Sequence, residues 1–171
     1  MLTEHVSCNS IPYLMKRFAA AILITLFAVS MAWAVEQKPV KPAAGDKCPV
    51  CGMFVAKYPD FVAQVIFKDG SYAVFDGAKD MFKYYFNLKK YAPAKRAEDI
   101  DAIYVTDYYS LEPIDGRMAW YVVGSDIFGP MGKELVPFAK ESDARGFMKD
   151  HKGKSLLLFK DIHDELIRGL D

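Results

Sequence analysis

Apolar and polar positions recur along the chain in patterns that predict short strands and helices. Residues 62–67 and 71–75 are rich in side chains that fit a pleated surface, and an Asp-Gly pair between them signals a hairpin turn. Within 77–88 apolar residues recur at spacings of three and four, which predicts a helix with one buried face, capped by Asp76. A further strand is predicted at 102–107.

The same order of elements recurs in the second half of the chain. It predicts two strands, a helix and a strand, at 119–123, 135–138, 142–152 and 155–159. The second hairpin differs from the first, because a long glycine-flanked loop around Pro130-Met131 interrupts it. Helices that follow hairpins favour an α+β fold of two tandem related ββαβ units, at about 47–110 and 117–162.

The first 34 residues have the pattern of a secretory signal peptide. Lys16-Arg17 precedes the apolar run 18–34, which closes on Ala-Trp-Ala. Met15 is an alternative translation start, because the segment from there has ordinary signal length. An uncleaved membrane anchor is the competing interpretation, since 17 apolar residues lie at the short limit for a spanning helix.

Export would place the mature protein in the periplasm. It is expected to begin with a flexible polar linker, 35–46, followed by one domain at 47–162 and a polar tail at 163–171. The chain has 22 basic and 22 acidic side chains, scattered along its length. This balance argues against a nucleic-acid surface, which needs clustered positive charge. We expect a monomer that binds neither DNA nor RNA.

The segment Cys48-Pro-Val-Cys51-Gly-Met53 is the first candidate for chemistry. Attachment of a c-type haem is excluded because Gly, not His, follows the second cysteine. A structural zinc site needs four ligands, yet no second cysteine pair follows, and His151 and His163 are expected at the surface. A thiol–disulfide oxidoreductase using Cys48 and Cys51 remains an alternative, although no strand precedes the pair as in thioredoxin-like enzymes. A third alternative is a zinc site or a disulfide that only stabilises the structure near the N-terminus, with the function located elsewhere.

Methionine at position 53 favours a different interpretation, a copper site. In an extended segment residues i and i+2 point to the same side, so the sulfurs of Cys51 and Met53 could meet at one ion. A thiolate with a thioether is a soft pair that selects Cu(I). Met131 could supply a third sulfur, although a single methionine is more often core filler. Cys48 is either a fourth ligand or the disulfide partner of Cys51.

These motifs together resemble the NosL family, the exported accessory proteins of nitrous oxide reductase maturation. The resemblance rests on Cys51-Gly-Met53, on the strand ending at Asp107, and on Gly129-Pro-Met131-Gly followed by Val136-Pro-Phe-Ala139. It implies a fold similar to organomercurial lyase and a Cu(I)-binding protein rather than an enzyme. The implied partner is a client copper enzyme or its membrane assembly complex, and the implied ligands are Cys51, Met53 and Met131.

Overall fold

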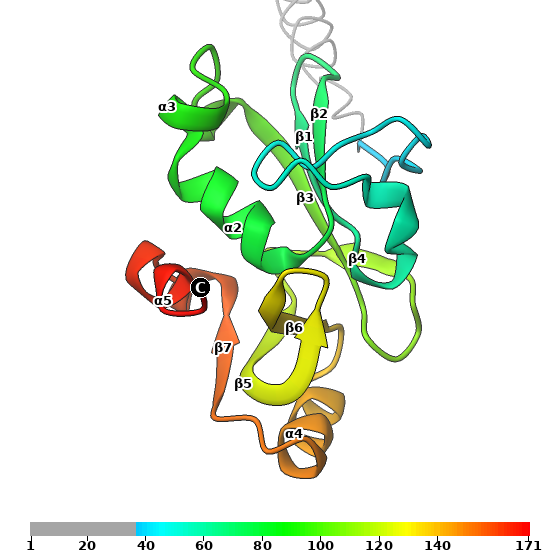
Figure 1. Ribbon diagram of the computed structural model, residues 1–171, viewed down its shortest axis with the longest axis vertical. Helices are drawn as coiled ribbons and strands as arrows, with labels where there is room; N and C mark the ends of the chain where they lie inside the picture. Colours follow the sequence, from blue (N-terminus) through cyan, green and yellow to red (C-terminus); the bar gives the residue numbers. More distant parts are fainter. Residues whose placement is uncertain (1–36) are drawn as a thin grey trace, which may run out of the picture. The chain divides into compact units, whose positions relative to one another are not determined.

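The computed structural model describes residues 37–171, which contain two antiparallel sheets and several helices (Figure 1). The predicted signal peptide, the alternative start at Met15 and the competing membrane anchor lie outside the described residues. Within the described part of the chain, no helix is both long and apolar enough to cross a bilayer.

The first sheet has four antiparallel strands and contains the first predicted hairpin. Its strands in spatial order are β2 (Tyr72–Phe75), β1 (Ala63–Phe67), β3 (Ile100–Thr106) and β4 (Pro113–Asp115). The central strand β1 is buried along its whole length and pairs Ala63 with both Phe75 and Val105. Strand β4 was not expected, because three residues at an edge are too few to show a periodic pattern.

The second sheet repeats the arrangement of the first. Its strands in spatial order are β6 (Gly132–Phe138), β5 (Trp120–Gly129) and β7 (Ser155–Leu158). In both sheets the first strand of the unit lies between the second and the third, and all neighbours are antiparallel. The prediction of an α+β fold with two related ββαβ units is therefore confirmed.

The long loop expected between β5 and β6 is instead a continuation of their hairpin. Pairing is irregular between Val123 and Phe128, and then resumes with Gly129 opposite Gly132. Only Pro130 and Met131 are left to turn the chain, and Gly132 adopts φ +87°, which glycine tolerates without strain. The sequence prediction was wrong here because glycines also occur at tight hairpin turns.

The helices pack around both sheets, with α2 between them. Their bounds are α2 (Ala78–Phe86), α3 (Leu88–Tyr91), α4 (Glu141–Asp150) and α5 (Asp164–Arg168). Short 3-10 helices occur at Val55–Lys57, Pro59–Phe61, Ala97–Asp99 and Phe159–Asp161. Helix α2 contacts β1, β2, β6 and α5 (Figure 1), whereas α4 packs on the second sheet. Helix α2 is therefore the element that both sheets share.

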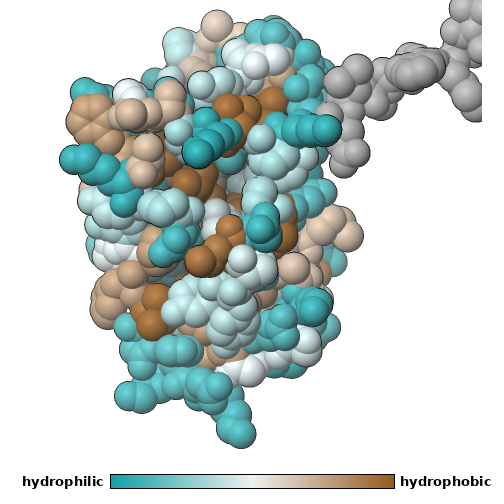
Figure 2. Space-filling model, turned by 90° about the vertical axis from the view of Figure 1, so that its right-hand side faces the viewer, coloured by the Kyte–Doolittle hydropathy of each residue, from teal (hydrophilic) through white to brown (hydrophobic). Residues whose placement is uncertain are grey.

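One continuous core joins the two units. Phe75 and Phe82 of the first unit pack in the same cluster as Tyr121 and Leu135 of the second. The rings of Phe82 and Tyr121 meet edge to face with centroids 5.3 Å apart. On the face seen in Figure 2, apolar patches lie among hydrophilic residues.

Both ends of the described chain pack against the domain. The expected polar tail forms α5, where Ile167 is fully buried, and Leu170, three residues later, is also buried. This spacing sets both side chains on one face toward α2, so the description of 163–171 as a polar tail is corrected. In the segment expected to be a flexible linker, the Val40 amide donates to Gln64 Oε1 at 2.7 Å.

Candidate metal site

The cysteine motif folds as a tight hairpin. The Cys48 amide donates to the Met53 carbonyl and the Gly52 amide to the Cys48 carbonyl, both at 2.9 Å, and Gly52 adopts φ +81°. The segment is therefore not extended, and the expectation that Cys51 and Met53 align as residues i and i+2 does not apply. An isolated antiparallel bridge between Lys47 and Phe54 closes the hairpin.

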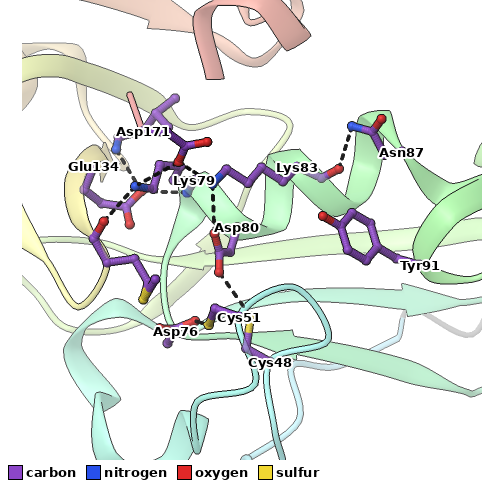
Figure 3. A network of polar contacts seen from close by, with 12 residues as sticks. Cys48, Cys51, Asp76, Lys79, Asp80, Lys83, Asn87, Tyr91, Glu134 and Asp171 are labelled. Atoms are coloured by element: carbon purple, nitrogen blue, oxygen red, sulfur yellow. Dashed lines mark hydrogen bonds and ion pairs between the residues drawn. The ribbon is translucent and has the colours of Figure 1, made fainter. Parts of the chain in front are cut away.

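Each thiol of the hairpin is directed at a carboxylate at the start of α2 (Figure 3). Cys51 Sγ donates to Asp76 Oδ1 at 3.1 Å, and Cys48 Sγ to Asp80 Oδ2 at 3.4 Å. Both cysteines are free thiols. One ligand atom from each of the four residues lies within 4.8 Å of all the others. This group, Cys48, Cys51, Asp76 and Asp80, is called the Cys/Asp cluster below.

Sequence reasoning missed the acidic half of the cluster. Asp76 was expected to cap the helix, but Gly77 is the N-cap residue, and the Lys79 amide in the first turn donates to Glu134 of β6. The Asp76 carboxylate faces Cys51 instead, and its second oxygen, Oδ2, is buried without a hydrogen-bond partner within residues 37–171. No local signal indicated this pairing, because Asp76 precedes the helix and its position relative to Asp80 depends on the extended backbone of Gly77.

Burial sets the protonation of the two cysteines. Removal from water raises the pKa of Cys48 to about 12. Burial also raises the pKa of Cys51, and the hydrogen bond to the Asp76 carboxylate raises it further. Both thiols therefore keep their protons at neutral pH, and a cation that binds them must displace those protons.

Met131 lies at the same pocket as Cys51. A cavity of about 460 Å³ is lined by Cys51, Asp80 and Met131, together with basic and acidic side chains of α2, α3 and the C-terminal segment. Met131 is 43% exposed and Cys51 is half-buried, whereas Cys48 is buried and does not line the pocket. Met53 is half-buried and is not among the residues that line this pocket. The fold thus places Cys51 and Met131, which are distant in the sequence, in the lining of one pocket.

A buried lysine connects the β5–β6 turn to α2. Lys79 is 2% exposed, and its Nζ donates to the Met131 carbonyl at 2.7 Å. The same Nζ lies 3.7 Å from Asp171 Oδ1, and Lys83 also pairs with Asp171. Because a buried lysine is costly unless it is paired, these contacts hold the turn that carries Met131 against α2.

Glu134 supports the same junction from β6. Its Oε1 accepts hydrogen bonds from the amides of Lys79 at 2.6 Å and Leu135 at 2.9 Å. Complete burial raises the pKa of Glu134 to about 8, although both amides and the Lys79 charge pull it down. The native state therefore holds a proton on Glu134 at pH values where the unfolded chain has lost it.

Replacement of Glu134 should change how stability depends on pH. Between about pH 4.5 and 8 the native state binds more protons at Glu134 than the unfolded chain does, so the wild type loses stability as pH rises. Glu134→Gln keeps the accepting oxygen and removes the titration. Its free energy of unfolding should rise relative to wild type from pH 5 to 8, as measured by urea unfolding. Exposed Glu98→Gln is the control, and parallel profiles for wild type and Glu134→Gln would contradict the prediction.

The two histidines of the domain lie elsewhere. His151 pairs with Asp126, with Nδ1 3.0 Å from Oδ1, and stacks on Phe147 beside the second sheet. His163 precedes α5, and its Nδ1 lies 3.2 Å from the Asp161 carbonyl oxygen. Neither histidine belongs to the Cys/Asp cluster.

These features define a class of protein: a small α+β domain of two ββαβ units with a thiol and carboxylate cluster that could hold a metal ion. The family model described as NosL matches residues 39–167. The chain belongs to the NosL family, as its motifs predicted.

Named relatives agree with this assignment. The chain is 30% identical over 165 residues to the copper-binding lipoprotein NosL of Stutzerimonas stutzeri, covering 88% of this chain and 83% of the relative. Its fold matches the crystal structure of the copper chaperone NosL from Shewanella denitrificans with a TM-score of 0.63 and 26% identity. That match covers 76% of this chain and 98% of the solved one.

Proposed function

We propose that this protein is an exported Cu(I)-binding metallochaperone that hands copper to a copper enzyme. Membership of the NosL family and the copper-binding names of its relatives support the choice of metal. The observation that carries the proposal is that Cys51 and Met131 both line one pocket. A thiolate and a thioether brought together in this way suit Cu(I) better than a hard divalent ion.

The proposed ligands are the Cys51 thiolate and the thioethers of Met53 and Met131. Cys48 is a fourth ligand or the partner in a disulfide that closes the site. Partial exposure of Met131 at the pocket supports transfer, since a partner's ligand can approach the ion there and replace the protein sulfurs one at a time.

The proposed location is the periplasm, and the proposed client is nitrous oxide reductase or its membrane assembly complex. The predicted signal peptide supports export, as does the relative named a lipoprotein. We further propose that the protein is a monomer without an enzymatic activity of its own. The raised pKa values of both thiols weigh against the alternative, a thiol–disulfide oxidoreductase, because such enzymes need a reactive thiolate.

An anaerobic Cu(I) titration against a chromophoric chelator tests the proposal. We expect one Cu(I) per chain, with binding weakened at least about 10-fold by Cys51→Ala, Met53→Ala and Met131→Ala, because each removes a soft donor. Met118→Ala is the matched control, since Met118 is 73% exposed and does not line the pocket. Equal affinities for the wild type and all three ligand variants would refute the sulfur site.

Two further assays separate delivery from the oxidoreductase alternative. Cu(I)-loaded protein should transfer its copper to the copper-free client enzyme, and the Met131→Ala variant should carry less copper to transfer. An oxidoreductase would instead reduce a disulfide substrate, or oxidise a dithiol substrate, equally well with and without Met131. Activity of that kind, with no copper transfer, would favour the alternative.

A further inference from the structure

We propose that Lys79 is a positioning residue for the Cu(I) site, because it fixes the β5–β6 turn in the place from which Met131 reaches the ion. The inference rests on the proposed copper function and concerns a residue that does not itself bind the metal. The Met131 thioether is a neutral, weak donor at the end of a hairpin. Its contribution to affinity therefore depends on how far its place is fixed before the ion binds.

A single side-chain hydrogen bond ties the Met131 turn to α2 in the described part of the chain. Pro130 and Met131 connect the paired residues Gly129 and Gly132, and Met131 is 43% exposed. Lys79 Nζ donates to the Met131 carbonyl at 2.7 Å, and no other side chain within residues 37–171 hydrogen bonds to these two turn residues. Loss of this bond would leave the turn to its own hairpin ladder.

Lys79 is itself held firmly, as a positioning residue must be. It lies in the first turn of α2, it is 2% exposed, and its backbone amide donates to Glu134 Oε1 at 2.6 Å. Its ammonium group also lies 3.7 Å from Asp171 Oδ1, so the buried positive charge has a counterion. One residue thus binds β6 through its amide and the turn of the same hairpin through its side chain.

The cysteine hairpin bonds to the same short stretch of the chain. Cys51 Sγ donates to Asp76 Oδ1 at 3.1 Å, directly before the N-cap residue of α2. The Cys51 thiol and the Met131 turn are therefore tied to positions 76 and 79. Their relative placement is set through the start of α2, which lowers the cost of ordering the two sulfurs around one ion.

A double-mutant cycle of Cu(I) affinities tests the proposal on the exported protein, purified reduced and metal-free. Lys79→Met keeps a long, unbranched side chain and removes the ammonium donor. We expect it to weaken Cu(I) binding about 10-fold, the effect usual for groups that orient a metal ligand. In the Met131→Ala background the same substitution should change affinity by less than about 2-fold, because no thioether is left to position. An effect of the same size in both backgrounds, or no effect in the wild type, would overturn the proposal.

Lys89→Met is the charge-matched control. Lys89 is an exposed lysine of α3 that does not line the pocket, so its loss should leave Cu(I) affinity unchanged. The outcomes also separate this inference from the proposed copper function. Unchanged affinity in Met131→Ala would refute the role of Met131 as a ligand. Weakened binding in Met131→Ala beside unchanged binding in Lys79→Met would refute the positioning role alone.

NMR of the methionine methyl groups gives a readout that a general loss of stability does not imitate. The Met131 signal is identified by its absence in Met131→Ala. Saturating Cu(I) should shift this signal less in Lys79→Met than in the wild type, and an equal shift would overturn the proposal. If Lys79→Met does not fold, the wild type decides. Its Lys79 ammonium group should exchange slowly with water in the Cu(I)-loaded protein, and fast exchange would show that the hydrogen bond is not kept.

Discussion

Oxidation of Cys48 and Cys51 to a disulfide should abolish Cu(I) binding, with an expected loss in affinity of at least about 100-fold. In the proposed site the Cys51 thiolate is a copper ligand, and a disulfide sulfur is a poor one. The two residues are free thiols whose sulfurs lie within 4.8 Å of each other, so they can form a bond once each leaves its carboxylate. The measurement is an anaerobic Cu(I) titration of diamide-treated protein after the disulfide has been verified by mass spectrometry.

The control for this experiment is Cys48→Ala, which cannot form the intramolecular bond. Its Cu(I) affinity should be the same before and after diamide treatment, provided that the treated protein is still monomeric. Reduction of the wild type with dithiothreitol, followed by removal of the reductant, should restore binding. Equal affinity of the verified disulfide form and the reduced form would show that the Cys51 thiolate is not a ligand.

Gly77→Ala should destabilise the domain by about 3 kcal/mol, near the upper end for overpacked interiors. A Cβ at this position would lie 2.1 Å from Glu134 Oε2 and 3.0 Å from the carbon of that carboxylate. Gly77 has an extended backbone that any residue adopts, so the effect is steric and not conformational. Glu134 cannot move away freely, because it accepts the amides of Lys79 and Leu135.

The matched control is the same substitution in α4. Gly146 is exposed in the helix, and a Cβ there would meet nothing within 4 Å. Gly146→Ala should therefore stabilise the protein by about 0.5–1 kcal/mol, since alanine loses less backbone entropy in a helix. Urea unfolding measures both variants. A Gly77→Ala protein as stable as wild type would mean that Glu134 does not pack against Gly77.

The parts of the fold that local pattern specifies were predicted well. Strands β1 and β2 and the Asp69-Gly70 turn agree with the sequence to within a residue or two, because β-branched and aromatic residues and a glycine at φ +81° act locally. Helix α2 was predicted from its apolar spacing. The β5–β6 turn and α5 were missed, because their short segments gain stability only when they pack against α2.

In the candidate site, too, the residue types were predicted from the sequence, whereas the contacts between them depend on the fold. Cys51 and Met131 were both named from their residue types, and the pocket that joins them was not visible in the sequence. Asp76 was interpreted as a helix cap, because a carboxylate before a helix ordinarily has that role. Its contact with Cys51 depends on how the cysteine hairpin lies over α2, and local spacing carries no information on such a contact.

By itself the sequence determined the class of fold and the membership of the NosL family, and it contains the cysteine and methionine residues that make copper the natural candidate. Hydrophobic periodicity and short motifs are local properties, and they persist in the chain before it folds. The tertiary structure alone decided which carboxylates face the thiols, which lysine holds the Met131 turn and how strongly burial raises the pKa of Cys48. Those outcomes depend on desolvation and on contacts between distant segments, which exist only when the core has formed.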